Sequence, residues 1–201
     1  MRATKAFLIW GCLVATVMVP LVVAAQSPLL QWRQPIYIVA GFAGIAAMAA
    51  ILCQPLLVGG YLPGLAARAG RRTHRVIGAV LIALVVVHVA GLWMTSPPDM
   101  IDALTFAAPT AFSTLGVISM WLLFGAAGLA LMRRHLRIRT WRIGHASCVT
   151  LAVLTAVAHA MLIEGTMGYW SKAALCLCVV VAAAKVMADL KIWRSFRRKK
   201  S

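Results

Sequence analysis

The stretch THRVIGAVLIALVVVHVAGLWM, residues 73–94, is almost entirely apolar but carries two histidines, His74 and His88. A second stretch, RIGHASCVTLAVLTAVAHAMLI at residues 142–163, carries His145 and His159. In each stretch the second histidine follows the first by 14 residues. Fourteen residues of α-helix rise about 21 Å and complete nearly four turns. Each pair is therefore expected on one face of its helix, at two depths.

The composition around these stretches indicates a membrane protein. Of the 201 residues 63% are hydrophobic, and the mean hydropathy is +0.91, whereas soluble domains are about 45–50% apolar. A helix needs about 20 apolar residues to cross a bilayer. The sequence predicts one all-α domain over residues 1–201, a polytopic bundle whose six spans lie near 6–25, 36–58, 73–94, 111–132, 142–163 and 172–190.

The basic residues predict the orientation of these spans. The net charge of +16 sits in short loops and in the tail 191–201, which favours lipid-headgroup contact over nucleic acid. With the N-terminus inside the cell, only Arg33 and Lys172 of the 20 basic residues fall outside, so we predict N-in, C-in topology. The other basic residues are Arg2, Lys5, Arg68, Arg71, Arg72, Arg75, Arg133, Arg134, Arg137, Arg139, Arg142, Lys185, Lys191, Arg194, Arg197, Arg198, Lys199 and Lys200.

The first span also has features of a secretory signal. Arg2 and Lys5 precede its apolar core, and Val23-Ala24-Ala25 is a candidate cleavage site. The core is long for a signal peptide, so we favour a retained helix, and cleavage would leave the orientation of the other spans unchanged.

The four span histidines predict two metal centres at different depths. Spans three and five both run outward, so His74 should face His145 near the inner leaflet, and His88 should face His159 nearer the outer one. Ionisable side chains inside a membrane are costly and indicate function. Two neutral imidazoles saturate haem iron and favour electron transfer. We expect two haem b groups about 20 Å apart, or one if His74 is merely interfacial.

Other residues are weaker site candidates. His135, in a basic loop, is expected to be solvated. Five arginines at the depth of the inner pair could neutralise haem propionates, although topology alone also explains them: Arg71, Arg72, Arg75, Arg139 and Arg142. Small residues could allow close helix approach: Gly78, Gly125, Gly128 and Gly144. Three outer acids could attract a cationic acceptor, although ordinary loop polarity explains them equally well: Asp99, Asp102 and Glu164.

The pattern Thr73-His74-Arg75…His88, then Arg139-Thr-Trp141-Arg142-Ile-Gly-His145…His159, resembles the ferric-reductase-like transmembrane domain. That superfamily includes ferric reductases, NADPH oxidases and the haem-b membrane subunit of the bacterial periplasmic methionine-sulfoxide reductase system. The resemblance runs from about residue 40 to 190 and includes Ser113–Trp121. It implies that His74, His88, His145 and His159 are the haem ligands, in the inner membrane of a bacterium.

The resemblance implies electron transfer across the membrane. The sequence has no G-x-G-x-x-G after a strand, so we expect no FAD or NAD(P)H domain in this chain. Electrons would come from a separate cytoplasmic flavin reductase or quinol, and would pass to ferric iron or a periplasmic redox enzyme outside. The alternative is the membrane subunit of a methionine-sulfoxide reductase system, for which His74 is one histidine more than expected.

A transporter or assembly factor, with the histidines as a proton path, is the alternative from another class. Proton paths usually include carboxylates within the membrane. No Asp or Glu falls in the middle of a predicted span, since Asp189 lies near the inner end of the last one. The sequence therefore favours electron transfer.

Overall fold

The computed structural model describes residues 2–191 as helices joined by short loops, without a strand in that range. The six long helices are each long and apolar enough to cross a membrane, which confirms the predicted all-helical, polytopic membrane protein. The elements are α1 (Arg2–Ala25), η1 (Pro28–Leu30), α2 (Pro35–Gly59), α3 (Ala67–Thr95), α4 (Pro97–Leu104), α5 (Ala111–Leu131), η2 (Met132–Arg134), α6 (Ile138–Leu162) and α7 (Tyr169–Asp189).

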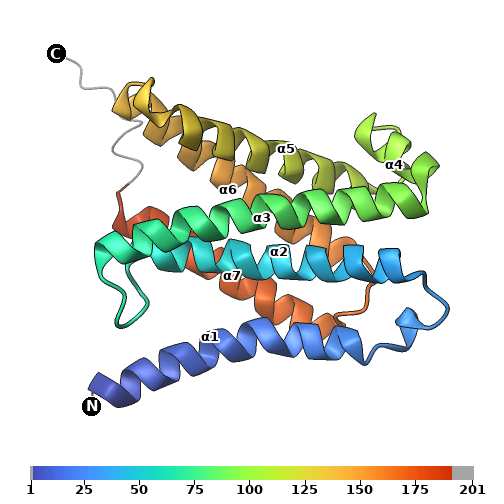
Figure 1. Ribbon diagram of the computed structural model, residues 1–201, viewed down its shortest axis with the longest axis horizontal. Coiled ribbons are helices and arrows are strands. Elements are labelled where there is room, and N and C mark those ends of the chain that lie inside the picture. Colours follow the sequence, from blue (N-terminus) through green and yellow to red (C-terminus); the bar gives the residue numbers. More distant parts are fainter. Residues whose placement is uncertain (1, 192–201) are drawn as a thin grey trace.

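The long helices run along one common direction (Figure 1). Helices α1, α3 and α6 run one way and α2, α5 and α7 the other, so the two histidine-bearing helices, α3 and α6, are parallel as expected. We call the end with the α2–α3 loop and η2 the basic end, and the opposite end the α4 end. The basic tail predicted at 191–201 lies outside the described residues apart from Lys191.

Both histidine-bearing helices begin earlier than their apolar segments. Helix α3 begins at Ala67 and α6 at Ile138, whereas the hydropathy placed the spans from 73 and 142. Alanine and arginine are good helix formers, so the helices continue beyond their apolar part. His74 therefore lies in the third turn of α3 and not at its start. The short helix α4 was not predicted, although Pro97 at its first turn and Asp99 are typical of a helix start.

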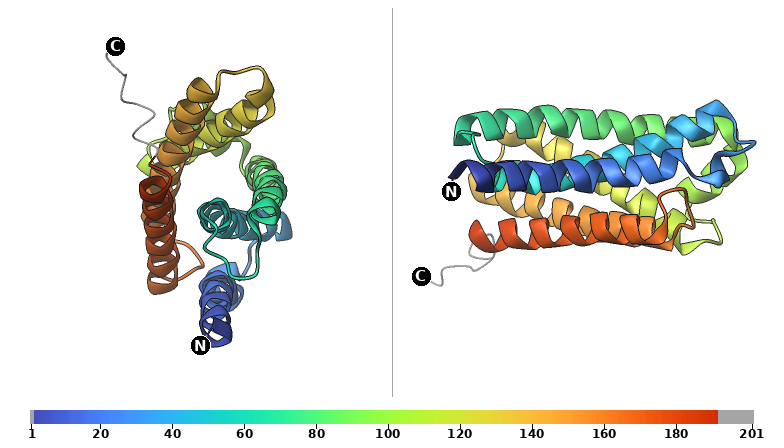
Figure 2. Two further views of the ribbon diagram at one scale, coloured as in Figure 1. Left: turned by 90° about the vertical axis from the view of Figure 1, so that its left-hand side faces the viewer. Right: turned by 90° about the horizontal axis from the view of Figure 1, so that it is seen from below.

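Two helical hairpins form most of the bundle. Helix α2 packs on α3, α5 packs on α6, and α7 joins the hairpins by packing on α2 and α6. Helix α1 packs on α7 and α2, at one side of the bundle when it is seen end-on (Figure 2). Glycines let α2 and α3 approach closely, because a Cβ on Gly91 would lie 2.7 Å from the Ala40 Cβ and one on Gly70 would lie 2.9 Å from the Leu57 carbonyl oxygen.

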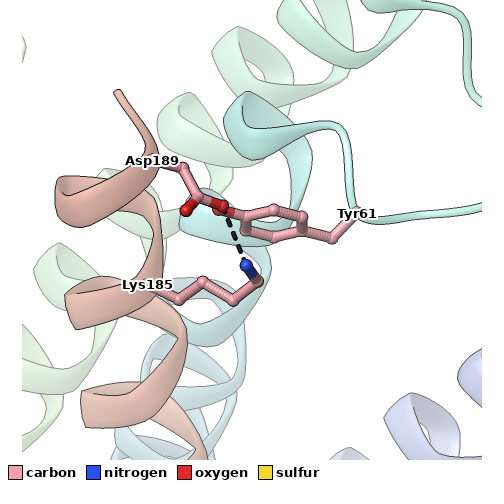
Figure 3. A network of polar contacts seen from close by, with 3 residues as sticks. All are labelled: Tyr61, Lys185 and Asp189. Carbon is pink, nitrogen blue, oxygen red and sulfur yellow. Dashed lines mark hydrogen bonds and ion pairs between the residues drawn. The ribbon is translucent and has the colours of Figure 1, made fainter. Parts of the chain in front are cut away.

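A polar clasp ties the α2–α3 loop to α7 at the basic end (Figure 3). The Tyr61 hydroxyl donates to Oδ2 of Asp189 over 2.6 Å, and the Lys185 ammonium pairs with the same oxygen at 2.8 Å. The ammonium also lies 4.9 Å from the centre of the Tyr61 ring. These contacts fix the loop that precedes the first histidine-bearing helix.

We expect the clasp to loosen only in strong alkali. Partial burial, then the hydrogen bond to Asp189 and the Asp189 charge, raise the pKa of Tyr61 to about 12. Because the folded value lies above the ordinary pKa of about 10, the contribution of this tyrosine to stability is complete below pH 10. It is lost as the pH rises through 12. The ultraviolet absorbance of the phenolate, as the difference between wild type and Tyr61→Phe, should show this midpoint.

Asp189→Asn should move that midpoint down towards pH 10, because the amide removes the negative charge that opposes ionisation. Asp99→Asn, at the other end of the bundle, is the control and should leave it unchanged. An unmoved midpoint in Asp189→Asn would contradict the clasp. Since these side chains are largely exposed, Tyr61→Phe should cost under about 1 kcal/mol of stability.

Candidate functional site

A cavity of about 720 Å³ lies between the two hairpins, lined by residues of α2, α3, α5 and α6. Its volume is within the range of about 300–1,000 Å³ typical of small-molecule and cofactor sites. The lining is mostly apolar, and it reaches the α6–α7 loop at the α4 end. Both His88 and His159 line this cavity. The structure therefore brings together two of the four predicted ligands beside a space large enough for a cofactor.

The His88 and His159 rings lie next to each other at a spacing suited to a shared metal ion. Their centroids are 6.5 Å apart and their planes are 79° from parallel. Metal–imidazole bonds are about 2.0–2.1 Å long and the ring nitrogen lies about 1.2 Å from its centroid, so two imidazoles joined through one ion have centroids roughly 6.4 Å apart. The centroid spacing of the pair is therefore that of two imidazoles which share one ion.

Backbone hydrogen bonds leave the other ring nitrogen of each histidine free to bind. Nδ1 of His88 lies 2.7 Å from the Ala40 carbonyl oxygen, and Nδ1 of His159 lies 2.7 Å from that of Phe112. A carbonyl oxygen only accepts, so Nδ1 must carry the proton and donate. Nε2 then keeps its lone pair, which is the tautomer that metal-ligating histidines adopt.

Glycines make room for both outer rings. A Cβ on Gly44 would lie 2.9 Å from Nδ1 of His88, and one on Gly116 would lie 2.7 Å from Nδ1 of His159. In an α-helix the carbonyl of residue i bonds to the N–H of residue i+4, and Gly44 and Gly116 are four residues after Ala40 and Phe112. Glycine therefore lets each imidazole reach a carbonyl that the helix already uses.

At the inner level, Nδ1 of His145 lies 3.1 Å from the Ala126 carbonyl oxygen. Its ring stacks on Trp141, with centroids 5.6 Å apart and planes 18° from parallel. The Arg133 guanidinium lies 4.6 Å from the centre of the same indole. The indole Nε1 of Trp141 is buried without a hydrogen-bond partner among the described residues. A donor left unpaired in this way is costly, and an acceptor bound beside His145 would satisfy it.

His74 is held less firmly than the other three histidines. Its Nδ1 lies 3.4 Å from the Gln54 carbonyl oxygen, which is long for a hydrogen bond. The Gln54 side chain competes for the same nitrogen. With its amide turned so that the oxygen accepts from the Gly78 N–H over 2.8 Å, its NH2 group donates to Nδ1 of His74. That arrangement would put the ring proton on Nε2 and block metal binding.

The inner rings are also less closely associated than the outer ones. No ring contact joins His74 and His145 among the described residues, whereas one joins His88 and His159. At the i+4 positions of the inner carbonyls stand Val58 and Ala130. The distance from each histidine Nδ1 to its carbonyl oxygen increases with the size of the side chain at the i+4 position. It is 2.7 Å where that residue is glycine, 3.1 Å where it is alanine and 3.4 Å where it is valine.

The two hairpins repeat one polar framework. The acceptor carbonyls Ala40 and Gln54 on α2 correspond to Phe112 and Ala126 on α5, 72 residues later in both cases. Gly44 and Gly116 are also 72 apart, and the histidine pairs are 71 apart. The histidine spacing of 14 residues thus matches the spacing of the carbonyls that hold the rings. The chain provides two similar half-sites that face each other.

The remaining predicted site residues lie at the two ends of the bundle. The five candidate arginines are exposed and lie on α3 and α6 within two turns of the inner histidines: Arg71, Arg72, Arg75, Arg139 and Arg142. His135 is exposed in the loop after η2. Asp99, Asp102 and Glu164 are exposed at the α4 end, and of these only Glu164 lines the cavity.

No group of three or more His, Cys, Asp or Glu residues in residues 2–191 is placed to hold a metal ion. The candidate site is thus a two-histidine one.

Gly44 and Gly116 were not among the predicted site residues. Of the glycines singled out for close approach, Gly128 has nothing within 4 Å of an added Cβ, and the nearest atom at Gly125 is 3.8 Å away. Comparison of the two hairpins at an offset of 72 residues would have found Gly44 and Gly116. Lys172 was counted only as a topology signal, but it is buried and lines the cavity.

Comparisons with known proteins add no neighbour: no family model, no curated protein and no solved structure matches this chain. The resemblance to the ferric-reductase-like domain therefore stays a prediction based on the histidine pattern.

Proposed function

We propose that the protein carries electrons across a bacterial inner membrane through b-type haem held by histidine pairs. The observation that carries the proposal is the outer site. There two imidazoles on parallel helices have centroids 6.5 Å apart, and each donates through Nδ1 to a backbone carbonyl. Such a donor set is suited to axial ligation of one iron from both sides.

The residues of the cavity fit a flat macrocycle. His88 and His159, which line the cavity, would be the outer ligands. His74 and His145, which are not part of its lining, would be the inner ones. Gly44 and Gly116 provide the space that both outer rings need, and the lining is mostly apolar. At the inner level the unpaired indole N–H of Trp141 offers a donor to an acidic edge of the cofactor. Haem would supply a one-electron carrier whose iron, with both axial positions filled, does not bind oxygen.

The protein would hold these ligands fixed. The carbonyls of Ala40 and Phe112 would set the tautomer and orientation of the outer imidazoles, beside a mostly apolar lining. Donor and acceptor belong to other molecules: a cytoplasmic flavin reductase or quinol at the basic end, and ferric iron or a periplasmic redox enzyme at the α4 end. The helix rise places the two levels about 20 Å apart, which divides the crossing into two steps.

The test is electron transfer through the purified protein in sealed vesicles. Ferricyanide is enclosed in the lumen, and a reductant that cannot cross the bilayer is added outside. Vesicles with the protein should reduce the enclosed ferricyanide, and a low-spin b-type difference spectrum should accompany the reaction. Protein-free vesicles, and vesicles with a His88→Ala, His159→Ala variant, are the controls. Equal rates in all three, or no b-type spectrum, would refute the proposal.

A single-haem version is the second candidate, and the state of His74 favours it. The long contact to Gln54 and the competing side-chain amide make the inner site the less prepared one. A protein with the outer haem alone would fit the membrane subunit of a periplasmic methionine-sulfoxide reductase system. Loss of haem in His88→Ala but not in His74→Ala would identify that version.

A further inference from the structure

Lys172, in the first turn of α7, is a buried cation at the α4 end of the bundle. Its exposed fraction is 8%. Lysine is almost never this buried unless it is paired, because an uncompensated charge away from water is costly. Nevertheless, the one ion pair among the described residues joins Lys185 to Asp189 at the opposite end. The burial of Lys172 therefore needs another explanation.

Helix capping explains part of it. The ammonium donates to the Ile163 carbonyl oxygen over 2.5 Å and weakly to that of Met161 over 3.4 Å. These carbonyls close the C-terminal end of α6, where the helix dipole favours a positive charge. An ammonium has three N–H donors, and the third has no acceptor among the described residues. Capping thus leaves one N–H donor without an acceptor and the ammonium without an ion-pair partner among the described residues.

The same lysine lines the cavity of His88 and His159. Met161, whose carbonyl it contacts, lies two residues beyond His159 on α6, so the ammonium meets α6 within one turn of an outer histidine. Glu164 also lines the cavity, but it is exposed and makes no ion pair with Lys172. Lys172 is therefore a cation in the cavity lining that could pair with an anionic group of a bound ligand.

We propose that Lys172 binds a carboxylate of the cavity's occupant, the propionate of a haem held by His88 and His159. This rests on the proposed function. A charge-assisted N–H···O bond would use the third donor and pair the buried charge. A soluble acceptor is the poorer source of the carboxylate, because Lys172 is screened from solvent. The lysine would thus select for an acidic porphyrin and fix the direction in which its acidic edge points.

The test compares two porphyrins. Protein from haem-depleted cells is titrated with iron protoporphyrin IX and with its dimethyl ester, in which both carboxylates are masked, and the Soret band reports binding. Lys172→Met should bind the diacid about ten- to a hundred-fold more weakly than wild type. It should bind the diester as wild type does. Lys172→Arg should retain most of the preference for the diacid.

Lys185→Met is the matched control, because Lys185 is an exposed lysine of the same helix; it should bind both porphyrins as wild type does. Equal weakening for diacid and diester in Lys172→Met would show that the lysine only caps α6 and would overturn the inference. So would unchanged binding of both. Should Lys172→Met not fold, Lys172→Arg and wild type still give the diacid-to-diester ratio, and a wild-type ratio near one refutes the proposal. Wild type that binds neither porphyrin would instead refute the proposed function.

Discussion

Replacing His159 by alanine is expected to remove the outer haem and leave the inner one. His159 is one of two imidazoles whose centroids are 6.5 Å apart across the cavity, and the described residues include no third His, Cys, Asp or Glu able to complete a metal site there. The purified variant should hold half of the wild-type haem. Its difference spectrum should keep one low-spin component, and the other should vanish.

His88→Ala should give the same result, and the double variant should be no worse than either single one, because both side chains serve one iron. His135→Ala is the matched control, since His135 is exposed in a loop and its replacement should leave the haem content unchanged. If His159→Ala keeps all the haem with an unaltered spectrum, His159 is not a ligand.

Adding a methyl group at Gly116 is expected to displace the ring of His159. The new Cβ would lie 2.7 Å from Nδ1 and 2.8 Å from Cε1 of that imidazole, closer than atoms can pack. The ring must then move away from the Phe112 carbonyl, at a cost of about 1–3 kcal/mol for overpacking. A ligand displaced by more than about 0.5 Å no longer supports its site. Gly116→Ala should therefore weaken haem binding at the outer site at least about ten-fold.

Gly44→Ala should act in the same way through His88, where the added Cβ would lie 2.9 Å from Nδ1. The matched controls are Gly11→Ala on α1 and Gly128→Ala on α5, since an added Cβ meets nothing within 4 Å at either position and neither residue lines the cavity. A mid-helix Gly→Ala change is otherwise stabilising by about 0.5–1 kcal/mol. The controls should keep the haem and melt no lower than wild type, measured by Soret absorbance during heating. Haem loss equal in all four variants would show a general packing effect.

The sequence predicted the six helices and the parallel course of α3 and α6 because both depend on local signals. Apolar runs of about 20 residues define spans. Because one span, α5, lies between α3 and α6 in the chain, these two helices must cross the membrane in the same direction. His88 and His159 could be paired for the same reason. The structure places their rings together, and the role that this pairing serves stays a prediction until haem is measured.

The partners of the histidines could not be predicted, because they depend on contacts between helices. Nothing in the sequence near Ala40 or Phe112 shows that its carbonyl accepts from a histidine 48 or 47 residues away. The need for glycine at positions 44 and 116, where the two imidazole rings pack against the helix backbone, depends on the same contacts. Lys172 was read as a loop charge because its burial arises from α6 and its loop, which fold over it. The helix starts at Ala67 and Ile138 were missed because hydropathy detects the lipid boundary and not the end of a helix.

We propose that histidine pairs in this bundle hold haem, and the haem-to-protein ratio of the purified chain measures this directly. Pyridine haemochrome absorbance gives the haem, amino-acid analysis gives the protein, and the ratio is measured for wild type, His74→Ala and His88→Ala. We expect two haems per chain in wild type and one in each variant. If wild type holds one, His88→Ala should lose it and His74→Ala should keep it. A wild-type ratio near zero, in protein from cells supplied with haem, would contradict the proposal.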